Sequence, residues 1–400
     1  MKLESFLTFV KGSRIDSIVD KPETVAKKTE KVRYITINDF TSLDGEEKYI
    51  SLNKKHSLAE EEDILLNLQS QKTYRGIRGV YAHNFLKVLI DYNQMIDLFA
   101  AKKIDSEFVN ARTLKSFFYH YFNSKAFENQ YLASSLAQKI DFESIMIRKP
   151  YDRLVEIINK INLNEDSFAK ISNIEELNTV EKEIHDTKRE IIRLNLEIAS
   201  LFDSITSKEG NPESGKVKVG DIFTFAEEEV LESEDQKNKR VPFVQSYSFA
   251  GNNTVKSNKL TSDIELRSNR VFKFVEDDLL FSTYNKPLKS LAIAEFEGYT
   301  GYGVFVIKEF NKNIVNREFT IYLLKTDYFH NIISKFYKGR ERRSIDIDDF
   351  KKVTFYIPSY EKQLKFSETY NKNIMERIHL TRKLNKLEKQ YNDSLTQIFI

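Results

Sequence analysis

An apolar residue recurs every seven positions between residues 174 and 205, and this repeat constrains the fold more than any other feature of the sequence. One series is Leu177, Ile184, Ile191, Ile198 and Ile205. A second series, three residues later, is Val180, Thr187, Leu194 and Leu201, in which Thr187 is the one polar exception. This spacing predicts an α-helix of roughly 48 Å, at about 1.5 Å per residue, with one apolar stripe along it. A single helix cannot bury such a stripe, so we expect a partner helix.

A second segment with helical spacing, residues 358–400, supplies the expected partner. Its apolar face carries Leu380, Leu384, Leu387, Tyr391 and Ile398. We predict that the two helices pack antiparallel, because each apolar stripe needs the other for burial. The predicted seam consists of Leu177, Ile184, Ile191, Leu194, Ile198, Leu380, Leu384, Leu387 and Tyr391.

The segments that precede the two helices share a series of landmarks, which indicates an internal duplication. Residues 3–9 resemble 219–225, 34–40 resemble 243–249, 63–66 resemble 278–281, and 141–147 resemble 349–355. An aromatic helix predicted over residues 111–127 has a counterpart in 328–336. Two unrelated α/β domains of similar composition are the alternative, but a shared order at a nearly constant offset favours duplicated domains.

We therefore predict an α+β fold in which two similar globular α/β domains are separated by two long antiparallel helices, with a pseudo-two-fold duplication. The predicted divisions are 1–150 (first domain), 151–207 (central helical spacer), 208–215 (linker), 216–357 (second domain) and 358–400 (C-terminal helix). Strands are expected at 32–37, 63–68, 85–91 and 140–147, and a closing strand is expected at 349–355. These runs are rich in β-branched and aromatic residues.

Composition and motifs narrow the classes of function. The net charge of +2 means that nucleic-acid binding must come from local basic patches. The absence of cysteine excludes thiolate metal sites and fits a cytoplasmic location, and no apolar run is long enough to span a membrane. The six histidines form no i, i+4 pair for a metal. An adenine methyltransferase motif is also absent, since the nearest string, Asn211-Pro212-Glu213, lacks the second proline and the aromatic residue.

The segment that leads into the second long helix contains the most specific motif. It reads Ile357-Pro358-Ser359-Tyr360-Glu361-Lys362-Gln363, in which the pattern is Ile-Pro-x-x-Glu-x-Gln. Together with the duplication, this motif resembles the specificity subunit of type I restriction–modification systems. The first copy departs from the pattern, because Pro150 is not followed by a glutamine.

The resemblance implies a recognition protein that is not itself an enzyme. Each globular domain would be a target recognition domain that reads one half of a bipartite site in double-stranded DNA. The helices would set the spacer and dock two methyltransferase (modification) subunits, and restriction/translocase subunits would join through the complex. S-adenosylmethionine, Mg and ATP would then belong to these partner subunits, with no cofactor in this chain.

Polar and basic loops at matching places in the two copies are the candidate DNA-binding segments. Gln, Lys and Arg side chains suit contacts with base edges and phosphates. The candidates are Gln69, Gln71, Lys72, Tyr74, Arg75 and Arg78 in the first copy, and Tyr284, Asn285, Lys286, Lys338, Arg340, Arg342 and Arg343 in the second, with Asn252 and Lys256 as weaker ones. Solvent-exposed turns without a ligand are the alternative for each loop.

Two other classes of function remain open at this point. A coiled-coil structural or dimerisation protein with two ligand-binding domains explains the heptads, but it does not explain the matching polar loops. A cryptic nuclease explains DNA binding, but acidic residues are too common in the sequence to define a catalytic cluster. DNA binding without cleavage distinguishes the three interpretations.

Overall fold

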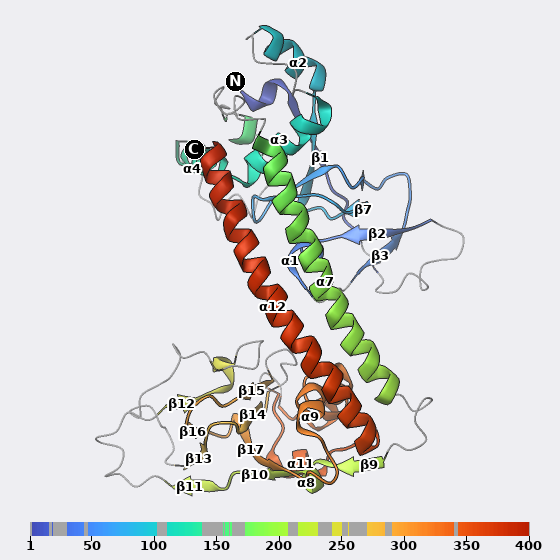
Figure 1. Ribbon diagram of the computed structural model, residues 1–400, viewed down its shortest axis with the longest axis vertical. Helices are drawn as coiled ribbons and strands as arrows, with labels where there is room; N and C mark the ends of the chain where they lie inside the picture. Colours follow the sequence, from blue (N-terminus) through green and yellow to red (C-terminus); the bar gives the residue numbers. More distant parts are fainter. Residues whose placement is uncertain are drawn as a thin grey trace. The chain divides into compact units, whose positions relative to one another are not determined.

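The computed structural model (Figure 1) describes residues 2–15, 18, 30–43, 47–101, 110–137, 155, 157–159, 161, 173–206, 215–230, 242–249, 255, 270–284, 290–339 and 343–399. The chain packs as two units. The first comprises Met1–Leu196 together with Glu376–Ile400, and the second comprises Glu197–Met375. The C-terminal end of the chain therefore belongs with the first unit in its packing.

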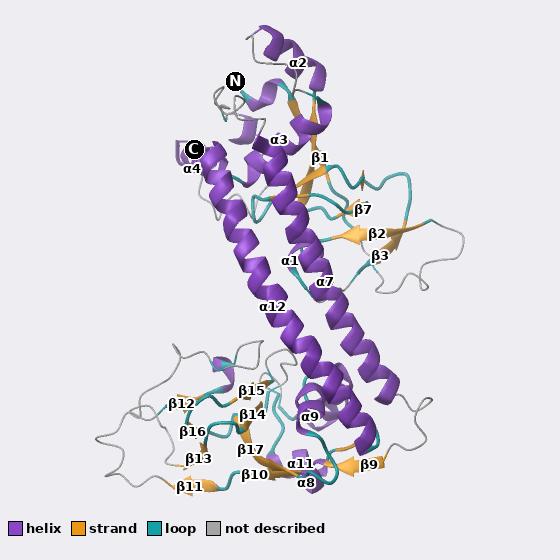
Figure 2. Ribbon diagram, in the orientation of Figure 1, coloured by secondary structure: helices purple, strands orange, loops and turns teal. Residues whose placement is uncertain are grey.

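The first unit contains two four-stranded sheets (Figure 2). Its elements are η1 (Leu3–Ser5), β1 (Leu7–Lys11), β2 (Lys31–Ile35), α1 (Asn38–Thr41), β3 (Tyr49–Ser51), β4 (Leu58–Ala59), β5 (Ile64–Asn67), β6 (Thr73–Tyr74), β7 (Gly79–Tyr81), β8 (Phe85–Ile90), α2 (Tyr92–Ala101), α3 (Ala111–Asn123) and α4 (Lys125–Ala137). One sheet has the order β1-β8-β5-β6 and the other has the order β3-β2-β7-β4.

The second unit contains two sheets of the same size and a short ribbon. Its elements are β9 (Gly215–Lys218), α8 (Val219–Ile222), β10 (Phe223–Phe225), β11 (Glu228–Val230), β12 (Phe243–Val244), η6 (Ser246–Ser248), β13 (Arg270–Phe274), β14 (Leu279–Ser282), β15 (Leu291–Ile293), β16 (Gly298–Thr300), β17 (Val304–Phe310), α9 (Arg317–Leu323), α10 (Asp327–Ile333), η10 (Ser334–Phe336), α11 (Ile347–Lys352) and β18 (Thr354–Ile357). The sheet orders are β10-β17-β14-β15 and β11-β13-β16-β12, and β18 pairs with β9.

Strand pairing confirms the internal duplication. β1-β8-β5-β6 and β10-β17-β14-β15 have the same order, and every pair within them is antiparallel. In the second sheets, β2 pairs with β7 in parallel at Tyr34↔Val80, and β12 pairs with β16 in parallel at Phe243↔Tyr299. Tyr34 and Phe243 are the positions that the sequence comparison had matched.

β5 and β14 are buried on both faces, which explains their uninterrupted apolar sequences. In the first unit, Ile64 and Leu66 contribute to one core while Leu65, pointing the other way, contributes to the second. In the second unit, Leu279 and Phe281 likewise contribute to one core, and Leu280 contributes to the other. Alternation along a strand sends neighbouring side chains to opposite faces, so one short strand serves two cores.

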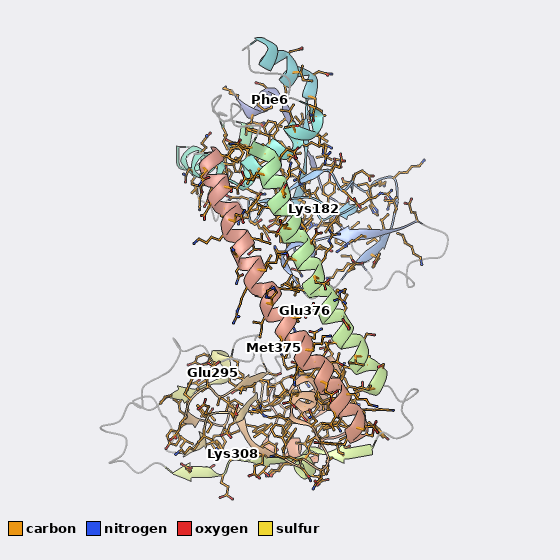
Figure 3. The ribbon with its side chains drawn as sticks, viewed as in Figure 1. Phe6, Lys182, Glu295, Lys308, Met375 and Glu376 are labelled. Carbon is orange, nitrogen blue, oxygen red and sulfur yellow. The ribbon has the colours of Figure 1, made fainter. Side chains whose placement is uncertain are left out.

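The aspartate that precedes each of these strands organises the turn before it. Asp63 accepts a hydrogen bond from the Glu60 backbone N–H (3.0 Å) and an ion pair from Lys87 (2.9 Å). Asp278 repeats this arrangement with the Val275 backbone N–H (2.7 Å) and Lys308 (2.7 Å). The side chain of Lys308 is labelled in Figure 3. The repeated Asp in the sequence landmark is thus a structural residue in both copies.

The closing segments of the two copies differ from the prediction. In the second unit, residues 349–352 belong to α11, and the strand begins at Thr354. The Leu3 backbone N–H donates to the Ile161 carbonyl (3.1 Å), as the Val219 N–H does to that of Val353 (2.9 Å). Ile161 and Val353 are therefore counterparts in this contact. Residues 140–147, with the predicted strand and the predicted match to 349–355, lie outside the described residues.

The two long helices, α7 (Ile174–Thr206) and α12 (Tyr360–Phe399), are antiparallel, as predicted. Within the first unit, Leu177 near the start of α7 shares a core with Leu395, and Ile191 further along packs in a cluster with Leu384. An ion pair between Lys188 and Glu388 (3.0 Å) flanks this seam. Ile198 is buried in the core of the second unit instead.

The remaining seam residues and the polar exception have clear roles. Leu194 is 3% exposed, whereas Leu380 and Tyr391 are partly buried against the seam. Thr187 is buried, and its hydroxyl donates to the Glu183 carbonyl one turn earlier (2.7 Å). A threonine is therefore tolerated in the apolar stripe, because its polar group is satisfied within its own helix.

Gln363, from the Ile-Pro-x-x-Glu-x-Gln motif, joins the start of α12 to the second unit. Its side chain is fully buried. Oε1 accepts the Asn316 backbone N–H (2.9 Å), and Nε2 donates to the carbonyls of Ile314 (3.0 Å) and Pro358 (2.9 Å). Asn316 is also the N-cap of α9. The motif thus encodes a junction between a helix and a domain.

Candidate nucleic-acid interface

Three segments of the second unit meet at one edge of its sheets. The Thr283 backbone N–H, just after β14, donates to the Gly303 carbonyl in the turn between β16 and β17 (3.1 Å). The Ile345 N–H donates to the Thr283 carbonyl (3.1 Å), and Tyr284 forms a β-bridge with Ser344. The loop after β14 and the basic segment around Lys338–Ser344, both predicted to face DNA, are therefore brought together.

The two ends of the basic segment are joined, and its first cation is already paired. Lys338 and Ser344 exchange two backbone hydrogen bonds (2.8 and 2.9 Å), and Gly339 has a positive φ of 105°, which glycine adopts readily. The Lys338 ammonium contacts Asp346 (3.1 Å) and Asp349, and these hydrogen bonds raise the pKa of Lys338. Arg343 is exposed, and no ion pair to it occurs among the described residues. Arg343 is accordingly the better placed cation for a ligand.

The first unit has the same edge. The Leu68 backbone N–H donates to the Asn84 carbonyl (2.8 Å), which ties the loop after β5 to the turn between β7 and β8. Asn67 shapes that loop, since its Oδ1 accepts the backbone N–H groups of Gln69 (3.0 Å) and Ser70 (2.9 Å). Gln71, half-buried, has a positive φ of 57°, while the side chains of Gln69 and Lys72 are exposed.

The turns themselves carry two exposed residues that the sequence analysis missed. Each turn closes with the same bond: Phe85 N–H to Ala82 carbonyl (2.9 Å), and Val304 N–H to Gly301 carbonyl (3.1 Å). In the first unit, the residue after the acceptor is His83, which is exposed. In the second unit, it is Tyr302, which is 56% exposed. His83 and Tyr302 occupy equivalent positions in the two copies. Aligning the two copies residue by residue at these turns would therefore have found both ring-bearing residues.

Tyr302 is held at the surface by two neighbours. Its ring lies at right angles to that of Phe272, with centroids 5.6 Å apart, and its hydroxyl donates to the Glu228 carboxylate. The ring edge and face are therefore presented in a defined orientation. A preorganised aromatic ring loses little conformational entropy when it binds a ligand.

Three of the residues predicted to bind DNA are engaged within the first unit. The Tyr74 ring stacks on Phe40 (4.7 Å), and the exposed Arg78 pairs with Glu60 (3.1 Å). Arg75 is only 20% exposed and forms a buried ion pair with Glu181 of α7. Its guanidinium donors are used inside the protein, by Ser116, Asn178 and Glu181. The local sequence does not show this, because Glu181 is 106 positions away. Base reading by Arg75 stays a prediction.

Other predicted residues are not placed by the structure. Asn252, Lys256, Asn285, Lys286, Arg340 and Arg342 lie outside the described residues. Within the described ranges, no group of three or more His, Cys, Asp or Glu residues could hold a metal ion. None of the described helices is long and apolar enough to cross a membrane.

Comparison with known proteins finds one matching family model and several similar solved structures. Residues 211–397 match the family model described as the type I restriction modification DNA specificity domain. Similar solved structures include the HsdS subunit from Thermoanaerobacter tengcongensis (14% identity, TM-score 0.41, covering 98% of this chain and 96% of that chain) and the type I restriction-modification S subunit from M. genitalium (11%, 0.49, 100% and 95%). A third similar structure is from a study of complex assembly and conformational transition of the type I R-M system (12% identity, TM-score 0.42, covering 98% of this chain and 97% of that chain). No curated protein gives a significant match.

The matched region contains the second unit from Gly215 to Met375, and the first unit repeats the sheets and the loop-and-turn edge of the second. The chain therefore carries a type I restriction modification DNA specificity domain over residues 211–397.

Proposed function

We propose that the loop-and-turn edge of each unit reads one half of a bipartite DNA target. The observation that carries this proposal is that one backbone framework is built twice and presents different side chains. The first edge carries Gln69, Lys72 and His83, whereas the second carries Tyr284, Tyr302 and Arg343. Amide, imidazole and guanidinium groups distinguish base edges in the major groove through their donors and acceptors. A constant framework with variable side chains is what two different half-sites require.

The antiparallel helices supply the second part of the proposal. They connect the recognition domains at a set spacing and dock two methyltransferase subunits, and restriction/translocase subunits join through the complex. The chemistry that needs S-adenosylmethionine, Mg and ATP belongs to these partners. The matching family model and the two edges support this assignment.

Paired variants in the reconstituted complex test the proposal. Gln69→Ala/His83→Ala removes exposed groups from the first edge, and Tyr302→Ala/Arg343→Ala removes them from the second. Each base contact contributes about 1–3 kcal/mol of discrimination. We therefore expect each double variant to relax the methylated sequence in one half-site, as measured by methylome sequencing, and to leave the other half-site unchanged.

Each variant is the matched control for the other. The isolated chain serves as a further control, since it should bind DNA but neither methylate nor cut it. If both variants weaken methylation of every site equally, without changing either half of the motif, these residues contact the phosphate backbone or support the fold. An identical motif and rate in both variants would contradict the proposed edge.

A further inference from the structure

The guanidinium of Arg75 is enclosed by side chains from α3 and α7 at the point where β6 ends. Its Nε donates to one Glu181 carboxylate oxygen (3.2 Å), and Nη2 donates to the other. Nη1 donates to Ser116 Oγ (3.1 Å), and Nη2 also donates to Asn178 Oδ1 (3.0 Å). The group lies 4.2 Å above the centroid of the Tyr119 ring. A bidentate pair of this kind accepts a narrow range of orientations.

Two further side chains extend the cluster to α12. His120 Nε2 lies 3.0 Å from Asn178 Oδ1, and its Nδ1 lies 2.7 Å from the Tyr391 hydroxyl. An amide oxygen only accepts, so with this assignment of the amide Nε2 carries the proton. Burial lowers the pKa of His120 to about 4, so the ring is neutral and Nδ1 accepts from Tyr391. Directional hydrogen bonds therefore run from the end of β6 through α7 and α3 to α12.

The charge of the cluster is constant over the ordinary pH range. Burial raises the pKa of Glu181, but hydrogen bonds from His185 and Arg75 outweigh burial and hold it at about 2. The hydrogen bond to Glu181 also raises the pKa of Arg75, despite its burial. One anion and one cation thus remain paired beneath the first recognition domain.

The corresponding junction in the second unit combines aromatic packing with the hydrogen bonds of Gln363. Phe202 of α7 lies 5.7 Å from Phe319 and 5.9 Å from Phe366, measured between ring centroids, and Tyr322 lies 5.2 Å from Phe366. Apolar burial is non-directional and tolerates small rotations. The first domain is therefore attached to α7 by a bidentate ion pair, whereas aromatic packing and the Gln363 hydrogen bonds attach the second domain to its helices.

We propose that the Arg75–Glu181 pair is a positioning element that fixes the rotational setting of the first recognition domain on α7, and with it the spacer length that the complex accepts. This inference rests on the proposed function, because the first domain must read a half-site for its setting to matter. A buried ion pair often adds little net stability compared with apolar residues of similar volume, so its directional bonds are its distinctive contribution.

The test separates positioning from stability with the double variant Arg75→Met/Glu181→Leu. Replacement of both partners removes the charges together and avoids an unpaired buried ion, so stability should remain close to that of the unchanged protein. The complex with its modification subunits would be assayed for methylation of duplexes that carry both half-sites with the native spacer, one base pair less or one more. We expect the preference for the native spacer to fall by about tenfold, equivalent to about 1.4 kcal/mol, with both half-site sequences unchanged.

A second variant decides the question if the double variant fails to fold. Arg75→Lys keeps the positive charge beside Glu181 but loses the fork that reaches Ser116 and Asn178, so spacer preference should fall to a smaller extent. A wild-type spacer preference in the folded double variant, or in Arg75→Lys when the double variant does not fold, would overturn the inference. If the unchanged complex shows no bipartite motif at all, the proposed function fails instead.

Discussion

Two histidines of the first unit show how strongly the environment decides a residue's role. His120 is fully buried between Asn178 and Tyr391, whereas His83 is exposed on the turn between β7 and β8. In the sequence, both are scattered histidines without an i, i+4 partner for a metal. Burial makes one of them part of the folded core, and exposure makes the other available to a ligand.

The buried histidine makes the first unit sensitive to acid. Burial lowers the pKa of His120 to about 4, from the ordinary histidine value of 6.5, so the unfolded chain binds more protons between these pH values. Stability must then fall as the pH drops from about 6.5 to 4, by an amount on the order of 3 kcal/mol. We expect urea denaturation to show this loss. His120→Gln should lower stability at pH 7 but flatten its pH dependence over that range, and an equally steep dependence in the variant would contradict the assignment.

Local sequence was sufficient to predict some residues of the edges and insufficient for others. The polar loop after β5 was predicted from its composition, and Asn67 indeed shapes a tight turn there that leaves Gln69 and Lys72 exposed. Arg75 has the same composition signal, but its partner Glu181 is 106 positions away. Long-range pairing of this kind leaves no local pattern, so the sequence could not distinguish a buried arginine from a DNA-binding one.

At the scale of elements, hydrophobic periodicity predicted the helices and the central strands well. The heptads predicted α7, and the apolar runs predicted β5 and β8, with boundaries that differ by a residue or two. The helix expected over 111–127 is interrupted at Ser124, which is the C-cap of α3 and accepts the Phe127 backbone N–H (3.3 Å). Its aromatic side chains are core residues, as Phe117, Phe118 and Phe122 are 2% exposed or less. One serine is too weak a signal to predict a helix end where the aromatic helical pattern continues on both sides.

Gln363 provides a test at this scale. Gln363→Leu leaves the Asn316 N–H and the carbonyls of Ile314 and Pro358 without their buried partner, and each unsatisfied group costs about 1–3 kcal/mol. We expect a loss of at least about 2 kcal/mol in chemical denaturation. Gln390→Leu, at an exposed glutamine of the same helix, is the matched control and should have little effect. Equal stability of the two variants would rule out this role for the motif glutamine.

For the whole molecule, the proposed function makes helix length a determinant of the DNA target. Insertion of one heptad at facing positions of α7 and α12 preserves the apolar seam and adds roughly 10 Å of helix. At about 3.4 Å per base pair, the unread spacer should lengthen by about three base pairs, while both half-sites keep their sequences. Methylome sequencing of the insertion variant measures the spacer directly. Normal activity at the original spacing would show that the helices do not set it.

The packing of the last turns of α12 into the first unit has a consequence for the order of folding during synthesis. Leu395, Ile398 and Phe399 belong to the core that contains Leu3 and Phe117, and the rings of Phe399 and Phe117 are 5.4 Å apart. The second unit, Glu197–Met375, is one continuous stretch, so a ribosome completes it before it makes Glu376–Ile400. The first unit can therefore obtain all of its core only after the second unit has been synthesised. A chain that stops before Leu395 lacks three of the side chains that fill this core, so a truncation far from Met1–Leu196 in the sequence should destabilise that part of the protein.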